Sequence, residues 1–265
     1  MSSLRPPAVE ADGSISTETH DRVLEIRVDR AAKYNGFTPR MAWDLAEAYT
    51  AFEANEDLWV AVLTAEGPHF TAGLQLSAWD ITSALFPSDF VDPLGLGPMR
   101  RLKPLVAAVH GICFTIGIEL MLAADIVIAS EDARFGQVEV KRGLMPYGGA
   151  TLRMVERAGW GNAMRWLLTG DEFDAGTALR LGLVQEVVPK GTARDAALAL
   201  AKRIAAQAPL AVRATRASSD IYAREGEAAA IAALPRQSAV IAQTEDFAEG
   251  VRSFAERRDG RYAGR

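Results

Sequence analysis

The apolar and polar residues of the chain form alternating strand and helix patterns up to about residue 190. Residues 23–28 alternate between apolar and polar side chains, as a half-buried strand does. Compact apolar runs at residues 59–63, 105–109 and 125–129 are suited to buried strands. Because helical segments separate these strands, the pattern predicts an α/β layered fold.

A helix is predicted to follow the first strand. Thr38 is suited to the N-cap position, and Pro39 is suited to the first helical position. Apolar side chains then recur at helical spacing and give the helix one apolar face: Met41, Leu45, Tyr49 and Phe52. Residues 83–97 contain two prolines and two glycines without periodicity, which predicts a loop.

The last quarter of the chain has a helical pattern. Thr192 and Asp195 resemble a capping box that begins a helix. Three more helices are predicted over residues 209–221, 225–242 and 245–257. Their apolar stripes need a surface to cover, which is either the protein's own core or another subunit.

We therefore predict that the chain has three parts. Residues 1–20 are polar and rich in Ser, Thr and Pro, which is typical of a flexible N-terminal tail. Residues 21–190 form the α/β core, and residues 191–265 form a helical C-terminal region.

The composition is that of a globular protein with a sizeable core, because 49% of the 265 residues are hydrophobic and 24% are charged. A net charge of -5 gives no electrostatic reason to bind nucleic acid or an anionic membrane. The N-terminus lacks a signal-peptide pattern, and no apolar run is long enough to cross a bilayer. The single cysteine, Cys113, fits a reducing compartment, so we expect a cytoplasmic protein without nucleic-acid or membrane partners.

Two turns are candidates for binding a negative oxygen. Residues 111–125 are predicted as a strand end, a turn and a helix that begins near Ile116, where Gly117 lets a ligand approach the backbone. The first amides of a helix lack internal partners, so they bind a carbonyl oxygen or an anion well. Residues 70–76 hold a second turn, whose glycine could aim the Leu74 amide at a ligand. Each segment alone is better explained as an ordinary turn, but two converging amides would form an oxyanion hole.

Glu119 and Glu139 are the candidate proton carriers. Glu119 falls on the first turn of its helix among apolar residues, which favours a buried carboxyl with a raised pKa. The alternative is an exposed carboxylate that interacts with the helix dipole. Glu139 follows a predicted short strand at residues 133–136, and taken alone it is better explained as a solvated charge near Lys141 and Arg142.

Other enzyme classes find little support in the sequence. The three histidines are not accompanied by a Gly-x-Ser-x-Gly motif, which disfavours a serine hydrolase, and His110 is interpreted as structural. The sequence has no His-x-x-x-His pair and no cysteine cluster, so no metal site is predicted. The apolar neighbours of Cys113 favour a buried, inert thiol.

From about Val23 to Arg258, the chain resembles the enoyl-CoA hydratase/isomerase, or crotonase, superfamily. The matching segments are residues 70–74, 103–111, 117–125, 135–139, 143–149, 168–170, 178–184 and 249–254. Each segment is short, but their order and spacing are specific. The resemblance implies a core of repeated ββα turns wound into a spiral and a helical trimerisation region. It also implies a homotrimer, or a homohexamer built from two trimers.

The resemblance also implies an acyl-CoA thioester as substrate. The thioester oxygen would accept hydrogen bonds from the amides of Leu74 and Ile116, while Glu119 and Glu139 would move protons between water and the acyl carbons. The implied reaction is that of an enoyl-CoA hydratase, with fatty-acid degradation as the default pathway. An enoyl-CoA isomerase or another acyl-CoA-transforming member is the alternative enzyme, and a catalytically degenerate acyl-CoA-binding protein is the non-enzymatic alternative. Coenzyme A belongs to the substrate, so no separate cofactor is implied.

The family pattern implies further substrate-binding positions. These are Ala72, Gln75, Leu76, Ser77, Gly117 and Tyr147, with Arg30 and Lys33 toward coenzyme A. Three positions depart from the usual pattern. Ile116 stands in a turn that is usually rich in glycine, although a β-branched residue resists positive φ. Gln75 replaces a common Asp, and Tyr147 replaces a common glycine, where its phenol would shorten the acyl pocket or offer a hydrogen bond.

Overall fold

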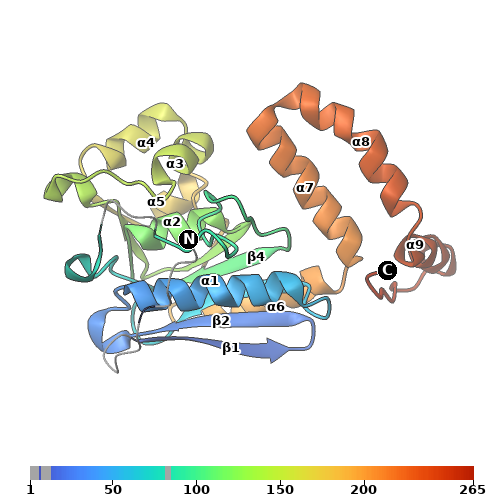
Figure 1. Cartoon of the computed structure of the whole chain (residues 1–265), viewed down its shortest axis with the longest axis horizontal. Coiled ribbons are helices and arrows are strands. Elements are labelled where there is room, and N and C mark those ends of the chain that lie inside the picture. The colour runs from blue at the N-terminus through green and yellow to red at the C-terminus, as the bar shows by residue number, and fades with distance from the viewer. Residues whose placement is uncertain (1–5, 7–12, 81–84) are drawn as a thin grey trace.

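The computed structural model describes residue 6, residues 13–80 and residues 85–265 (Figure 1). Residues 1–5 and 7–12 of the predicted tail lie outside the described residues, as do residues 83–84 of the predicted loop. Residues 85–97 contain neither helix nor strand, which confirms the loop prediction for that part.

The described part of the chain forms two sheets. The larger sheet has the order β1-β2-β3-β4-β6-β9, in which β1 and β2 are antiparallel and all other neighbours are parallel. Its strands are β1 (Ser14–His20), β2 (Val23–Asp29), β3 (Val60–Ala65), β4 (Leu105–Val109), β6 (Ile126–Ser130) and β9 (Glu186–Val188). The smaller sheet has the order β5-β7-β8, with β5 (Ile112–Phe114), β7 (Arg134–Gly136) and β8 (Glu172–Asp174).

Two helices cover opposite faces of the larger sheet. Helix α1 (Pro39–Ala54) packs against β1 and β2, and α6 (Ala193–Ala205) packs against β2, β3, β4 and β6. Four short helices gather around the smaller sheet (Figure 1): α2 (Ile116–Ala123), α3 (Ala150–Ala158), α4 (Trp160–Leu167) and α5 (Ala175–Arg180). Three turns of 3-10 helix are η2 (Ala31–Lys33), η3 (Leu76–Ala78) and η4 (Glu139–Arg142), and the last helices are α7 (Pro209–Glu225), α8 (Glu227–Ile241) and α9 (Glu245–Glu256).

Successive residues of β2 face two different apolar clusters. Leu24 and Ile26 belong to the cluster under α1, whereas Val23 belongs to the cluster under α6. The prediction of a half-buried strand is therefore wrong, because both faces are covered and even Glu25 is fully buried. Glu25, the polar residue in the middle of this strand, is buried in an ion pair instead of facing solvent.

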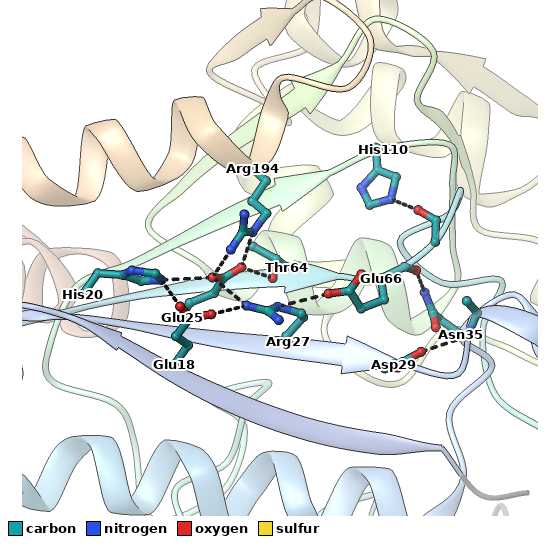
Figure 2. Close-up of polar contacts among 12 residues, drawn as sticks. Glu18, His20, Glu25, Arg27, Asp29, Asn35, Thr64, Glu66, His110 and Arg194 are labelled. Atoms are coloured by element: carbon teal, nitrogen blue, oxygen red, sulfur yellow. Dashed lines mark hydrogen bonds and ion pairs between the residues drawn. The ribbon is translucent and has the colours of Figure 1, made fainter.

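The buried Glu25 carboxylate is held by hydrogen bonds from four elements, among them one of 3.2 Å to the His20 ring of β1 (Figure 2). Arg194 of α6 donates to both of its oxygens at 2.7 Å. Arg27 of β2 donates at 3.1 Å, and the Thr64 hydroxyl of β3 donates at 2.9 Å. Burial raises the pKa of Glu25, but these hydrogen bonds outweigh burial and hold the pKa well below its usual value. The ionised Glu25 of β2 therefore holds α6 against the sheet through its ion pair with Arg194.

Part of the segment predicted as a flexible tail is a strand. Residues 14–20 of the predicted tail form β1, which pairs with β2 from Ser14 opposite Asp29 to His20 opposite Val23. A polar edge strand buries little apolar surface, so its composition resembles that of a tail. Helix α6, at the start of the predicted C-terminal region, packs on the sheet and buries the small side chains of one face: Ala193, Ala197 and Ala201.

Of the two predicted N-terminal helix caps, the one at Thr38 is present and the one at Thr192 is absent. The Thr38 hydroxyl accepts from the Met41 N–H at 3.2 Å at the start of α1, which confirms the predicted cap. Thr192 makes no such bond, and its hydroxyl instead donates to the Pro189 carbonyl at 2.7 Å. The predicted capping box is therefore absent, because Thr192 already has a helical φ and ψ of -107° and -3°.

Helices α7, α8 and α9 lie close to their predicted ranges and form a C-terminal arm (residues 209–256). In Figure 1, α7 and α8 lie side by side as a hairpin that projects away from the sheets. No residue of α8 is buried, and the arm exposes large apolar side chains: Tyr222, Ile231, Leu234, Val240, Phe247, Val251 and Phe254. Among the described residues, no helix is both long and apolar enough to cross a membrane.

Replacing Arg194 by alanine is expected to destabilise the fold by about 2–3 kcal/mol at pH 7, measured by urea unfolding. The variant leaves the buried Glu25 carboxylate with fewer donors. Because the pKa of Glu25 is depressed, the stabilisation is present above about 4.5, the ordinary value, and is lost as the pH falls. The difference between the proteins should therefore shrink toward pH 3.

The control for this experiment is Arg224→Ala. Arg224 forms an exposed ion pair with Asp220 on α7, which contributes at most about 1 kcal/mol. A loss in the Arg194 variant no greater than in this control contradicts the role given to the Glu25 cluster.

Candidate active site

A parallel bridge joins two turns from distant parts of the chain. Thr71 pairs with Cys113: the Thr71 N–H donates to the Ile112 carbonyl, and the Thr71 carbonyl accepts from the Phe114 N–H, both at 3.0 Å. Leu74 lies three residues after Thr71, and Ile116 lies three residues after Cys113. The bridge therefore holds the two turns that carry the predicted oxyanion amides beside each other.

The Leu74 amide is left out of the local backbone pairing. Phe37 donates to the Gly73 carbonyl at 2.8 Å, and its own carbonyl accepts from the Gln75 N–H at 2.9 Å. No acceptor for the Leu74 N–H exists among the described residues. Gly73 has a φ of 116°, and a Cβ there would lie 2.4 Å from the Thr115 hydroxyl oxygen. This turn therefore requires glycine.

The Ile116 amide is free for a different reason. Ile116 is the first residue of α2, so its N–H has no acceptor within the helix, and none is found elsewhere among the described residues. The strained conformation falls on Thr115, with a φ of 51° and a ψ of -115°. Ile116 thus avoids positive φ, as its β-branched side chain requires.

Leu74 and Ile116 line one cavity of about 420 Å³ together with both glutamates. A cavity of this size suits a small organic group, and its remaining walls are mostly apolar. The lining residues are Ala72, Leu74, Leu76, Leu85, Thr115, Ile116, Glu119, Val138, Glu139, Arg142, Leu144, Met145 and Tyr147. The structure therefore brings together the four residues that were predicted to carry the chemistry.

Glu119 lies on the first turn of α2 and is only 4% exposed. Its Oε1 accepts from the Gly148 N–H at 2.7 Å and from the Ala150 N–H at 3.4 Å. Burial raises the pKa of Glu119, although these hydrogen bonds act to lower it. Gly148 makes room for the carboxyl group, because a Cβ there would lie 2.2 Å from Oε2. The buried alternative for Glu119 is the one that the structure shows.

Glu139 is the first residue of η4 and is half-buried. Its Oε2 is buried and has no hydrogen-bond partner among the described residues. Burial, with a smaller contribution from the charge of Glu119, raises the pKa of Glu139 to about 7. The interpretation of Glu139 as a solvated loop charge is therefore wrong, because the carboxyl group is enclosed in the cavity wall. Near neutral pH, both of its protonation states are populated.

Three of the predicted substrate-binding residues line the cavity: Ala72, Leu76 and Tyr147. Tyr147 is 42% exposed and also lines a neighbouring cavity of about 260 Å³. Burial raises the pKa of the Tyr147 phenol, and the charges of Glu119 and Asp80 add to the effect. The phenol thus stands at the edge of the candidate site.

The remaining predicted substrate-binding residues lie outside the lining of this cavity. Gly117 serves packing rather than ligand approach, because a Cβ there would lie 2.7 Å from the Thr71 Cγ2. Arg30 donates to the Gly36 carbonyl at 2.9 Å, next to Phe37, which pairs with the turn that carries Leu74. Contacts with substrate stay predictions for Arg30, Gln75, Ser77 and Lys33.

Sequence reasoning missed several residues of the site. Gly148 was not recognised as the partner of Glu119, although the pair Gly148-Gly149 in a matching segment was a signal. Thr115 was not recognised as the strained residue, because the sequence argument considered only whether Ile116 could adopt a positive φ. Further wall residues had no signal of their own: Leu85, Val138, Arg142, Leu144 and Met145.

A larger cavity, of about 510 Å³, lies at the carboxyl ends of β3 and β4. Its cations are already engaged in salt bridges: Arg194 with Glu25, Lys190 with Asp132, and Arg134 with Glu172. His110 hydrogen-bonds to the Gly67 carbonyl at 2.9 Å (Figure 2), which agrees with a structural role. We therefore place the candidate site in the smaller cavity.

Comparison with known proteins defines the class. Residues 18–265 match the family model described as enoyl-CoA hydratase/isomerase, and the chain belongs to this family, whose members act on CoA thioesters. The chain is 32% identical to a protein named carnitinyl-CoA dehydratase from Citrobacter koseri, over 95% of this chain and 99% of that protein.

Two solved structures confirm the crotonase fold with its helical C-terminal region. The first is a probable enoyl-CoA hydratase/isomerase from Mycobacterium abscessus, with 46% identity, a TM-score of 0.92, and coverage of 95% of this chain and 98% of that chain. The second is an enoyl-CoA hydratase from Mycobacterium tuberculosis, with 36% identity, a TM-score of 0.87, and coverage of 97% and 100%.

Glu139→Gln is expected to stabilise the protein at pH 8 but not at pH 4. An unfolded glutamate ionises near 4.5, whereas Glu139 ionises near 7 in the folded protein. Stability of the wild type therefore falls between these two values as the pH rises, and the neutral amide avoids this loss. We expect a gain of about 1–2 kcal/mol at pH 8, which allows for partial exposure. The melting temperature measured at both pH values checks this, and an equal change at pH 4 and pH 8 contradicts it.

Proposed function

We propose that this protein is an enoyl-CoA hydratase, which catalyses the reversible syn addition of water across the 2,3 double bond of a 2-enoyl-CoA thioester. One observation carries the proposal: a single cavity is lined by Glu119 and Glu139 and by Leu74 and Ile116, whose amides have no acceptor in the described part of the chain. Hydration of a conjugated thioester needs both features. A base and an acid must act on one face, and donors must stabilise the negative oxygen.

In this mechanism, the amides of Leu74 and Ile116 donate to the thioester oxygen. They make C3 more electrophilic and stabilise the enolate-like oxygen that forms when water adds, an effect of roughly 3–4 kcal/mol per donor in known cases. One glutamate, as a carboxylate, takes a proton from water while the water oxygen bonds to C3. The other glutamate, as a neutral acid, delivers its proton to C2 as the thioester carbonyl re-forms.

The protonation states of the two glutamates support this division of work. Burial raises the pKa of both carboxyl groups, and the charge of Glu119 raises the pKa of Glu139 further. Two interacting carboxyls in one cavity resist double ionisation, so the pair favours a state in which one is ionised and the other is protonated. That state contains one base and one acid, as hydration requires.

The name of the Citrobacter koseri relative favours a second candidate substrate. Dehydration of a CoA thioester is the reverse of hydration and uses the same groups, so dehydration of carnitinyl-CoA is the second candidate. An enoyl-CoA isomerase, which catalyses a different type of reaction, is the alternative enzyme. It shifts a double bond with one acid–base group, which leaves the second glutamate of this cavity unexplained.

The purified protein is expected to hydrate crotonyl-CoA, followed as loss of the conjugated thioester absorbance. Glu119→Gln and Glu139→Gln should each lower kcat by about 10²–10⁴, because glutamine keeps the shape but neither accepts nor delivers the proton. Glu186→Gln, at an exposed position of β9, is the matched control and should leave the rate unchanged. Near-equal rates in the wild type and the double variant would rule out this mechanism and favour an acyl-CoA-binding protein without turnover.

Product analysis with three substrates separates the remaining enzymes. A hydratase converts a 2-enoyl-CoA to the 3-hydroxyacyl product and leaves a 3-enoyl-CoA unchanged. Conversion of the 3-enoyl-CoA to the 2-enoyl isomer would favour the isomerase. Preferential loss of water from carnitinyl-CoA would favour the second candidate.

We also propose that the protein assembles as a homotrimer or a homohexamer through the C-terminal arm. Its apolar side chains are unusually exposed for a monomer, with Phe254 87% exposed and Val251 58% exposed. Light scattering should give a mass three or six times the 28.5 kDa of one chain. Phe254→Asp should shift the protein toward smaller species, and a monomeric wild type contradicts the proposal.

A further inference from the structure

Thr115 occupies a strained backbone position at the centre of the candidate site. Its φ of 51° and ψ of -115° lie in a region that β-branched residues rarely adopt. Glycine would adopt the same conformation without steric cost. Strain of this kind persists only where the surrounding structure enforces it, and it concentrates at functional sites.

The Thr115 hydroxyl is a second feature without a structural explanation. Its Oγ1 is buried and has no hydrogen-bond partner among the described residues. A buried hydroxyl without a partner destabilises a fold, whereas valine fills the same volume without that cost. Neither the hydroxyl nor the branched side chain is therefore needed to build the turn.

The location of the hydroxyl explains both features. Thr115 is the residue directly before Ile116, and Gly73 is the residue directly before Leu74. The Thr115 Oγ1 lies against Gly73. A Cβ added to Gly73 would lie 2.4 Å from Oγ1. Thr115 also lines the candidate cavity. The hydroxyl therefore lies close to both turns that carry the amides, beside the cavity that Leu74 and Ile116 line.

We propose that the Thr115 hydroxyl is a third hydrogen-bond donor to the thioester oxygen and thus a further catalytic residue. This inference rests on the proposed function, because it requires the enolate-like oxygen of that reaction. The hydroxyl gives up no hydrogen bond to any residue that the structure describes when it turns toward the oxygen, and it keeps its proton throughout. Donors of this kind act strongly in a site from which water is excluded, and their hydrogen bonds commonly tighten only in the substrate complex.

Three substitutions at this position separate the hydroxyl from the shape of the side chain. Thr115→Val keeps the shape and removes the hydroxyl, Thr115→Gly removes both and relieves the backbone, and Thr115→Ser keeps the hydroxyl. Kinetic constants for crotonyl-CoA hydration and melting temperatures are measured for all variants and the wild type. The serine variant is the matched control.

The valine and glycine variants are expected to lose about 10- to 100-fold in kcat while KM changes by less than about threefold. The serine variant should keep kcat within about threefold of the wild type. The valine variant should melt no lower than the wild type, since it loses only an unpaired hydroxyl. A loss of kcat without a loss of stability distinguishes a donor from a structural residue.

Wild-type kcat in the valine variant overturns the inference and leaves Thr115 as a spacer between the turns. Equal losses in the valine and serine variants overturn it as well, since retention of the hydroxyl then makes no difference. An inactive wild type overturns the proposed function together with this inference. An active wild type with an equally active valine variant overturns the third donor alone.

Discussion

The backbone pairing of Thr71 with Cys113 is the contact on which the geometry of the site depends. It fixes the turn after β3 against β5, and β5 is itself paired with β7 through Cys113 and Phe135. The helix that follows β5 carries Glu119, and the chain that follows β7 carries Glu139. A single line of backbone hydrogen bonds therefore places both amide turns and both carboxyl groups relative to one another.

Buried glutamates serve two opposite purposes in this protein. Glu25 is surrounded by Arg194, Arg27 and Thr64, so it stays ionised and fastens α6 to the sheet. Glu139 has an oxygen without a partner, and burial brings its pKa into the physiological range. A buried carboxylate whose oxygens are fully hydrogen-bonded thus stays ionised and serves the fold. A buried carboxyl group with incomplete hydrogen bonding can instead exchange protons.

Much of the core could be predicted from the sequence because its signals are local. The N-cap at Thr38, the apolar runs of β3 and β4, and the helices of the C-terminal arm all follow from short-range pattern. Strand β1 could not be predicted, because a polar edge strand is defined by its partner and not by its own composition. Glu25 was equally invisible, since the donors that permit its burial come from distant elements.

The candidate site shows the same division. Glu119 was predicted to be buried from its apolar neighbours, but the burial of Glu139 depends on how η4 folds back over the cavity. The positions of Gln75 and Gly117 followed from alignment by resemblance, and the structure places neither in the cavity lining. Spacing along the chain cannot show which side of a turn a residue faces. The strain at Thr115 required coordinates for the same reason.

The most direct test of the account is a crystal structure with a bound saturated acyl-CoA, such as butyryl-CoA, which cannot be hydrated. The account predicts that the thioester oxygen lies about 2.7–3.1 Å from the backbone nitrogens of Leu74 and Ile116. It also predicts that the carboxyl groups of Glu119 and Glu139 lie on the same face of the C2–C3 bond. A thioester bound in the larger cavity beside Arg194, or a carboxyl group turned away from C2 and C3, would contradict it.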